Sequence, residues 1–240
     1  MKHIGAISGG KDSTAMALLL KEHCPPDTDF TWVCTPTGNE PPEWFAHMRQ
    51  LRDIIGPITP IMYPGGLGAL IRRYNALPNW RQRWCTRILK IEPFAAFLAR
   101  NAPAVFCVGL RADEEEREGG DYAAVEGVEM VFPLRQMGMG LADVWDYLHA
   151  RNQTVPKRTD CMVCFFQRLI EWYELWRDNP EGYAQGEAWE AETGHTFRSD
   201  GRDSWPAALK DLRAEFEKGR IPRETRKDNI GELKCRVCRQ

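Results

Sequence analysis

The stretch that decides the fold is His3-Ile4-Gly5-Ala6-Ile7-Ser8-Gly9-Gly10-Lys11-Asp12-Ser13-Thr14, followed by an apolar run over residues 15–20. An apolar segment that ends at two glycines and continues into helix-forming residues predicts a β-strand, a tight loop and an α-helix. Glycine lets the backbone approach a ligand closely and adopt positive φ. The N-terminus of the helix presents unpaired N–H groups and the positive end of its dipole, which suits a phosphate.

The side chains of this loop extend the prediction to a nucleotide and a metal ion. Lys11 can neutralise a phosphate, and the hydroxyls of Ser8, Ser13 and Thr14 can donate hydrogen bonds to it. Asp12 is unusual in a loop that binds only anions, but a carboxylate suits a Mg²⁺ ion that bridges phosphates. The alternative is an ordinary glycine turn in which Asp12 or Ser13 caps the helix. We expect Ser8, Gly9, Gly10, Lys11, Asp12, Ser13 and Thr14 to bind the nucleotide.

Strands and helices alternate over the first 150 residues. We expect strands at 3–7, 30–35, 58–63, 104–110 and 130–134, and helices at 12–23, 42–55, 87–100 and 141–152. This order predicts an α/β fold with a doubly wound, mainly parallel five-stranded sheet, whose ligands bind beyond the carboxyl ends of the strands. Later helices are expected at 165–178, 181–192 and 205–219. Residues 1–155 therefore form a predicted nucleotide-binding domain, and residues 156–240 a helical, cysteine-containing appendage.

Composition excludes several classes of protein. The 240 residues are 43% hydrophobic and 28% charged, which excludes a wholly disordered chain and a collagen-like or coiled-coil rod. The longest apolar run is far too short to span a membrane, and the first residues do not form a secretory signal, so we expect a cytoplasmic protein. The formal net charge of −2 does not favour nucleic acid, so any such attraction depends on local patches.

The segment from Ser8 to Ser13 resembles the PP-loop signature S-G-G-x-D-S of the adenine nucleotide α-hydrolase superfamily, and not a Walker A loop. Four later segments, in order, resemble the branch that contains phosphoadenosine phosphosulfate (PAPS) reductases. They are Thr37-Gly38-Asn39-Glu40; residues 83–90, RWCTRILK; Gly109-Leu110-Arg111-Ala112-Asp113-Glu114 with Arg117; and Pro133-Leu134 with residues 143–148, DVWDYL. Pro36 stands where that branch has an aspartate, so the role of the aspartate is not transferred.

The resemblance implies a Rossmann-like fold, an adenine nucleotide with Mg²⁺, and roles for individual residues. Thr37, Gly38, Gly109 and Arg111 would join the loop in binding the nucleotide. Lys11, Asp12, Arg111, Arg117 and Cys85 would take part in catalysis.

Two features favour an enzyme that cleaves ATP between its α and β phosphates and adenylates an acceptor for sulfur transfer. The loop signature is intact, and residues 233–240 lack the E-C-G-x-H motif of the reductases. The string from Cys85 to Lys90 looks most like that of sulfur-transfer members. The first alternative is a reductase acting on PAPS or adenosine phosphosulfate (APS). The second, of another class, is a non-catalytic nucleotide-binding accessory or sensor protein.

Five of the eight cysteines are candidate metal ligands: Cys85, the pair Cys161-x-x-Cys164 and the pair Cys235-x-x-Cys238. Four thiolates can hold a four-iron cluster or a zinc ion, and we slightly favour the iron–sulfur cluster. A fifth thiol would remain free to carry sulfur. The alternative is a redox pair or buried free thiols. Cys24, Cys34 and Cys107 are expected to be buried small hydrophobic residues.

Six basic residues and no acidic residue lie between positions 72 and 90: Arg72, Arg73, Arg81, Arg83, Arg87 and Lys90. This stretch and the basic tail could bind polyphosphate or nucleic acid, with Trp80 and Trp84 available for stacking, or simply be solvated. A sulfur donor protein is a further expected partner. The acidic run over residues 113–116 is expected at the start of a helix, and Trp172, Tyr173 and Trp176 in a hydrophobic core.

Overall fold

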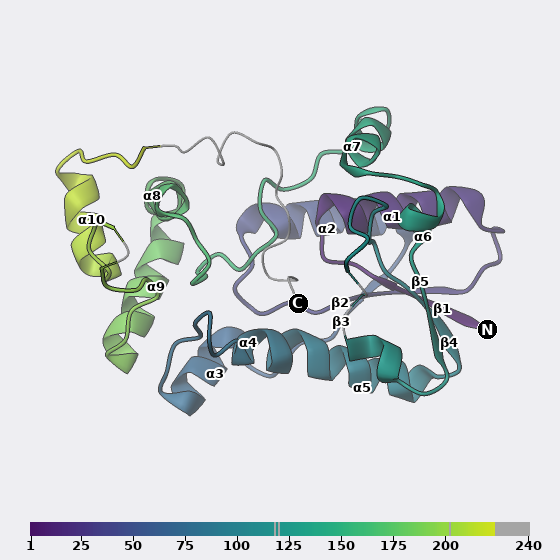
Figure 1. The fold of residues 1–240 in the computed structure, drawn as a ribbon, viewed down its shortest axis with the longest axis horizontal. Coiled ribbons are helices and arrows are strands. Elements are labelled where there is room, and N and C mark those ends of the chain that lie inside the picture. Colours follow the sequence, from purple (N-terminus) through teal and green to yellow (C-terminus); the bar gives the residue numbers. More distant parts are fainter. Residues whose placement is uncertain (118, 120, 202, 224–240) are drawn as a thin grey trace.

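The computed structural model describes residues 1–117, 119, 121–201 and 203–223. At its centre lies a five-stranded sheet of order β3-β2-β1-β4-β5, in which every neighbouring pair is parallel (Figure 1). The strands are β1 (Lys2–Ala6), β2 (Phe30–Cys34), β3 (Ile58–Pro60), β4 (Ala104–Cys107) and β5 (Val128–Val131). The strand order reverses between β1 and β4, so ligands are expected in the crevice beyond the carboxyl ends of these two strands.

Helices cover both faces of this sheet, which confirms the predicted doubly wound α/β fold. The first face carries α1 (Lys11–His23), α2 (Pro42–Ile55), α6 (Pro133–Gln136) and α7 (Leu141–His149). The second face carries α5 (Glu92–Asn101) and the 3-10 turn η2 (Asp121–Ala124). The apolar run after the glycine loop, residues 15–20, is a buried segment of α1. The α2 helix ends at Gly56, where φ is +99°. Local sequence therefore sets both the position and the length of the helices next to the crevice.

Two helical segments differ from the sequence prediction. The helix expected at 87–100 begins earlier, as α4 (Trp84–Thr86), and continues through a π-helical turn, η1 (Arg87–Ile91), into α5. Such turns are frequent at functional sites. The helix α3 (Gly66–Tyr74) was not predicted, because glycines at its start weaken the helical pattern. Gly66 has φ of +58°, and a Cβ atom there would collide with the carbonyl oxygen of Thr37.

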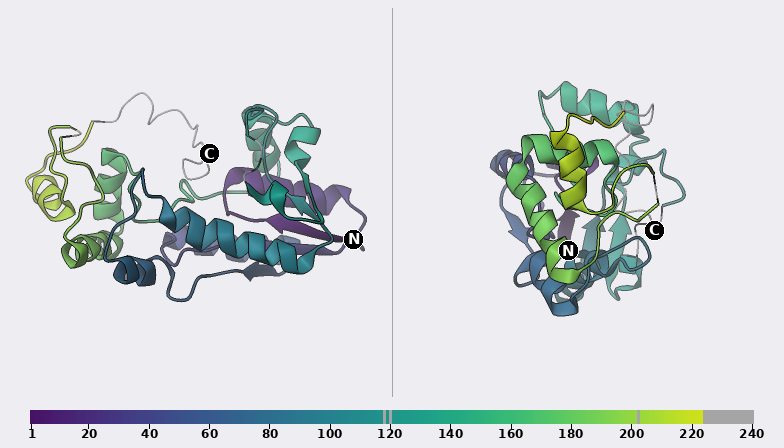
Figure 2. Two further views of the ribbon diagram at one scale, coloured as in Figure 1. Left: turned by 60° about the horizontal axis from the view of Figure 1, so that its bottom comes forward. Right: turned by 90° about the vertical axis from the view of Figure 1, so that its left-hand side faces the viewer.

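The helices α8 (Leu169–Asp178), α9 (Pro180–Thr193) and α10 (Leu209–Glu217) gather at one end of the molecule, beyond the carboxyl ends of the strands (Figure 2). They form a second hydrophobic core around Trp172, which is fully buried, with Tyr173 and Trp176 packed against it. This confirms the expected core role of all three. The same core also contains residues from α3 and from 77–89, which belong to the predicted first domain. The boundary at residue 155 therefore stays a prediction. No helix within the described residues is long and apolar enough to cross a membrane.

Candidate functional site

The glycine loop joins β1 to α1 at the strand crevice. Gly9 has φ of +79°, and a Cβ atom there would lie 2.6 Å from Nε1 of Trp44. That indole nitrogen instead donates a hydrogen bond of 2.8 Å to the carbonyl oxygen of Ser8. Gly10 is the N-cap of α1, and no side chain among the described residues caps the helix, so the alternative of a side-chain cap is not found. The first N–H groups of α1 are therefore available to an anion.

The three hydroxyl groups of the loop have different surroundings. The Oγ atoms of Ser8 and Ser13 lie 3.0 Å apart, and Ser13 donates to the carbonyl oxygen of Gly10 over 3.1 Å. Thr14 is fully buried, and its Oγ1 lies 2.9 Å from Nε2 of His47. Burial lowers the pKa of His47, which favours a neutral ring. Ser8 and Ser13 thus line the loop, whereas the hydroxyl of Thr14 faces the interior of the protein.

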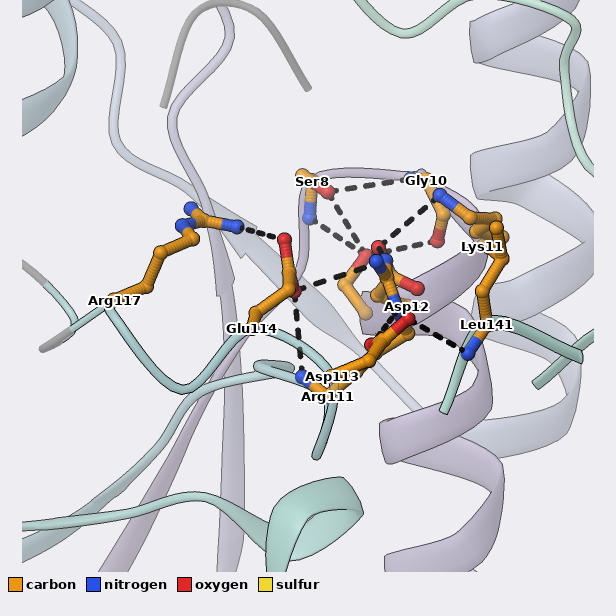
Figure 3. Close-up of polar contacts among 10 residues, drawn as sticks. Ser8, Gly10, Lys11, Asp12, Arg111, Asp113, Glu114, Arg117 and Leu141 are labelled. Atoms are coloured by element: carbon orange, nitrogen blue, oxygen red, sulfur yellow. Dashed lines mark hydrogen bonds and ion pairs between the residues drawn. The ribbon is translucent and has the colours of Figure 1, made fainter. Parts of the chain in front are cut away.

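Asp12 is the centre of the charged side chains at the loop (Figure 3). Its Oδ2 atom accepts from Nζ of Lys11 at 3.3 Å and from Nη1 of Arg111 at 3.0 Å. Its Oδ1 atom is buried and has no hydrogen-bond partner among the described residues. A buried carboxylate oxygen without a donor is suited to a cation, because a bare oxygen in this position is costly. The donor set at Asp12 therefore fits a Mg²⁺ ion.

Gly109 brings the end of β4 against this loop. A Cβ atom at Gly109 would lie 3.0 Å from the carbonyl carbon and oxygen of Asp12 and 3.1 Å from the nitrogen of Ser13. These are backbone atoms, which cannot rotate away as a side chain can. The glycine therefore allows the close approach that brings Arg111 to Asp12.

The acidic run after β4 holds the two predicted arginines. Residues 113–116 lie in turns, so the expectation that they begin a helix is wrong. Asp113 Oδ1 accepts from Nε of Arg111 at 2.8 Å, and Glu114 Oε1 accepts from Nη1 of Arg117 at 2.7 Å. Burial alone would raise the pKa of Asp113, but the guanidinium of Arg111 outweighs it and lowers that pKa. The sequence analysis gave these carboxylates no part in the site, although both lie between the two assigned arginines in the chain.

The turn after β2 is shaped by Glu40. Its Oε1 accepts from the backbone nitrogen and the hydroxyl of Thr37, both at 2.6 Å. Its Oε2 accepts from the nitrogens of Gly38 at 3.0 Å and Asn39 at 3.2 Å. The sequence analysis assigned nucleotide-binding roles to Thr37 and Gly38 but none to Glu40, although Glu40 is the last residue of the same motif.

This turn also fixes the first cysteine pair at the carboxyl edge of the sheet. The hydroxyl of Thr37 lies 3.3 Å from Sγ of Cys161. Asn39 accepts from the nitrogen of Met162 at 2.6 Å through its carbonyl oxygen, and its side chain donates to the carbonyl of Val163 at 2.9 Å. Three contacts therefore connect the turn after β2, residues 37–40, to the Cys161-x-x-Cys164 loop.

Cys85, Cys161 and Cys164 all belong to the second hydrophobic core. Burial raises the pKa of each thiol, and the positive charge of Lys90 opposes this effect at Cys85 and Cys161. Within the described ranges, no three His, Cys, Asp or Glu side chains are close enough together to hold a metal ion. Cys235 and Cys238 lie outside the described residues. The described part of the chain thus supplies the right kind of donor but not a complete metal site. Cys34 and Cys107 are buried, as expected, whereas Cys24 is only partly buried.

The basic stretch does not form one uniform patch. Arg72, Arg73, Arg81 and Arg87 are exposed, whereas Arg83 and Lys90 are partly buried. Of the two tryptophans, Trp80 is 61% exposed, while Trp84 is partly buried against Tyr74 with ring centroids 5.2 Å apart. Only Trp80 therefore offers a free ring face to a ligand.

A parallel sheet of this order, with an S-G-G-x-D-S loop between β1 and α1, defines a PP-loop protein of the adenine nucleotide-binding class. The family model of the phosphoadenosine phosphosulfate reductase domain matches residues 2–157, and the chain belongs to this family. The family match confirms the resemblance seen in the sequence.

Two solved structures are similar to this chain at low sequence identity. PAPS reductase from Candida auris, in a phosphate complex, is 13% identical, with 64% of this chain and 74% of that chain covered and a TM-score of 0.49. The U34-tRNA thiolase NcsA from Methanococcus maripaludis, with its [4Fe-4S] cluster, is 15% identical, with 94% and 83% covered and a TM-score of 0.48. A search of curated proteins found no match.

Proposed function

We propose that the protein is a PP-loop ATP pyrophosphatase that adenylates an acceptor for sulfur transfer. The observation that carries the proposal is the arrangement at Asp12, where one oxygen pairs with Lys11 and Arg111 and the other is buried with no hydrogen-bond partner in the described part of the chain. Together with the uncapped start of α1, this arrangement suits a polyphosphate with its divalent cation. In this proposal residues 1–155 bind the nucleotide, and residues 156–240 carry the two cysteine pairs.

The reaction would use the charges of the loop in the following way. The N–H groups at the start of α1 and the hydroxyls of Ser8 and Ser13 bind the phosphates. Lys11 and Arg111 stabilise the charge that develops when an oxygen of the acceptor attacks the α-phosphorus and the bond to the bridging oxygen breaks. Pyrophosphate leaves with that bonding electron pair. A bound Mg²⁺ ion at Asp12 would neutralise charge on the phosphates.

The second step replaces oxygen by sulfur. A sulfide sulfur attacks the adenylated carbon, and AMP departs with the original acceptor oxygen. If the sulfur comes instead from a cysteine persulfide, the acceptor is first joined to that cysteine through an S–S bond; a second cysteine thiolate then breaks this bond, which releases the thiolated acceptor and leaves a disulfide between the two cysteines. We propose Cys85, Cys161 and Cys164, with Cys235 or Cys238, as ligands of a four-iron cluster, with zinc as the alternative. The remaining thiol would carry sulfur, and a cluster would supply a soft site for sulfur near the nucleotide.

A reductase acting on PAPS or APS is the second candidate, since the family to which the chain belongs is described by that reaction. The intact loop favours ATP instead, because PAPS and APS carry no pyrophosphate chain for it to bind.

The test follows radiolabelled ATP with Mg²⁺ and separates AMP plus pyrophosphate from ADP plus phosphate. Lys11→Ala should abolish AMP formation, and Lys21→Ala, an exposed lysine at the other end of α1, is the matched control. Sulfite release from PAPS with a thiol reductant would support the reductase. Production of ADP, or absence of turnover with both nucleotides, would refute the proposal.

A further inference from the structure

A second hollow in the molecule lies away from the glycine loop. It is an open groove of about 1050 Å³ between three segments, namely residues 76–82, Phe165 with Phe166, and residues 195–199. None of the described residues that line it is an aspartate or glutamate. Arg81, which lines the groove, is exposed. The groove is therefore aromatic and basic, which suits a ligand with both ring faces and negative charge.

Trp80 is the most exposed aromatic side chain of the groove, at 61%. The loop holds it there, because Oδ1 of Asn79 accepts from the nitrogens of Arg81 at 3.0 Å and Gln82 at 2.9 Å. The guanidinium of Arg81 lies 4.7 Å from the ring centroid of Trp80. A tryptophan ring beside an exposed arginine is the pairing with which proteins hold unpaired bases and the phosphates next to them.

The opposite wall of the groove is also aromatic. Phe165 and Phe166 have ring centroids 4.2 Å apart, and the guanidinium of Arg83 lies 5.3 Å from the ring of Phe166. Arg198, in contrast, is 3% exposed and bound to Asp203, so its charge is already neutralised. The accessible cations therefore lie on the same wall as the exposed ring of Trp80.

The groove adjoins the cysteines. Phe165 directly follows Cys164, and Arg83 precedes Cys85 by two residues. On the opposite side, Cys161 touches Thr37 at the carboxyl edge of the sheet. The thiols are thus placed between the nucleotide crevice and the groove.

We infer that this groove binds single-stranded nucleic acid, with an unpaired base stacked on Trp80 and the adjacent phosphate at Arg81. The inference rests on the proposed function, since it names the acceptor of the sulfur-transfer reaction. A duplex does not fit, because its bases are stacked on one another and offer no free face to Trp80.

Fluorescence anisotropy of labelled oligouridylate and oligothymidylate of about twelve nucleotides tests the inference on the full chain. Trp80→Ala should weaken binding at least about fivefold, and Trp80→Phe should restore part of it. Arg81→Ala should reduce the slope of log affinity against log salt by about 0.7, the loss of one phosphate contact on a single strand. The controls are Phe45→Ala, an aromatic residue exposed on α2, and Arg52→Ala, also on α2, which should change neither quantity.

An excess of α,β-methylene ATP separates this site from the ATP site. Continued oligonucleotide binding in its presence is expected, whereas displacement would place the strand in the ATP site and overturn the inference. Equal loss in the Trp80→Ala and Phe45→Ala variants, or tighter binding of a duplex of the same length, would also overturn it. Failure of ATP cleavage is measured separately as AMP formation, so the two proposals can fail independently.

Discussion

Replacing Asp12 by asparagine tests the charged centre of the glycine loop. The substitution keeps the shape of the side chain but removes the charge that Lys11 and Arg111 share. Asp113→Asn is the matched control, because it removes a carboxylate from the same guanidinium at a similar distance, 2.8 Å against 3.0 Å. The two carboxylates differ in their exposure to solvent and in their second partner, which is Lys11 for Asp12 and the nitrogen of Leu141 for Asp113.

The exposed fractions set the expected magnitudes. The side chain of Arg111 is 1% exposed, that of Asp12 is 21% and that of Asp113 is 45%. A mostly buried charged hydrogen bond stabilises a protein by about 2 kcal/mol, whereas an exposed ion pair contributes roughly 0.5 kcal/mol. For a chain of this size these values correspond to a melting temperature lowered by about 4–8 °C for Asp12→Asn and about 1–2 °C for Asp113→Asn.

Thermal unfolding followed by circular dichroism, without nucleotide and at low salt, measures these shifts. A titration of AMP formation with Mg²⁺ tests whether Oδ1 of Asp12 binds the metal ion, as proposed. Asp12→Asn should lose Mg²⁺-dependent AMP formation, since an amide is a poorer ligand for Mg²⁺ than a carboxylate. Equal melting shifts for the two variants would contradict the burial argument. An unchanged Mg²⁺ dependence in Asp12→Asn would contradict the assignment of the metal to this residue.

Three further predictions concern the surrounding structure. Gly109→Ala should destabilise the protein by about 1–3 kcal/mol and weaken ATP binding, because its Cβ meets backbone at 3.0 Å; chemical denaturation and calorimetry measure these two quantities. The control Gly68→Ala within α3, whose Cβ meets no atom closer than 3.5 Å, should lower neither quantity. Burial raises the pKa of Glu190 to about 7, so stability should fall as pH rises from about 4.5 to 7, by roughly 2–3 kcal/mol, and Glu190→Gln should flatten this slope in denaturant unfolding. Lys90→Met should slow the alkylation of Cys85 followed by mass spectrometry, since the lysine charge lowers the pKa of that thiol; an unchanged rate would exclude this electrostatic effect.

The parts of the fold that local sequence specifies were predictable. The strand, glycine loop and helix at the start of the chain follow from an apolar run, two glycines and a second apolar run. The five parallel strands then follow from the repeated alternation of short strands with helices. The α2 helix was predicted with the bounds it has, because a proline opens it and a glycine closes it.

The parts that depend on long-range contacts were not predictable. The glycines at the start of α3 weaken its helical sequence pattern. Gly66 is nevertheless needed there, because it lies against the carbonyl of Thr37, which is distant in the sequence. The π-helical turn could not be predicted either, because residues 87–91 have the composition of an ordinary α-helix. The burial of Thr14 against His47 depends on how α2 packs on α1. Residue type indicates that a hydroxyl can bind phosphate, but only the packing shows in which direction it points.

The turn at Thr37 explains how the two halves of the proposed reaction would be aligned. Its carbonyl oxygen accepts from the nitrogen of Leu67 at 2.7 Å, which anchors α3, and its hydroxyl contacts both Glu40 and Cys161. The carboxyl edge of β2, the cysteine loop and the helix that leads to the groove therefore meet at one residue. Because α3 begins with glycine at this contact, the approach leaves no space for a side chain. Two of the contacts join backbone to backbone, from Leu67 to Thr37 and from Met162 to Asn39, so a shift of this turn would move the cysteine loop and the start of α3 with it.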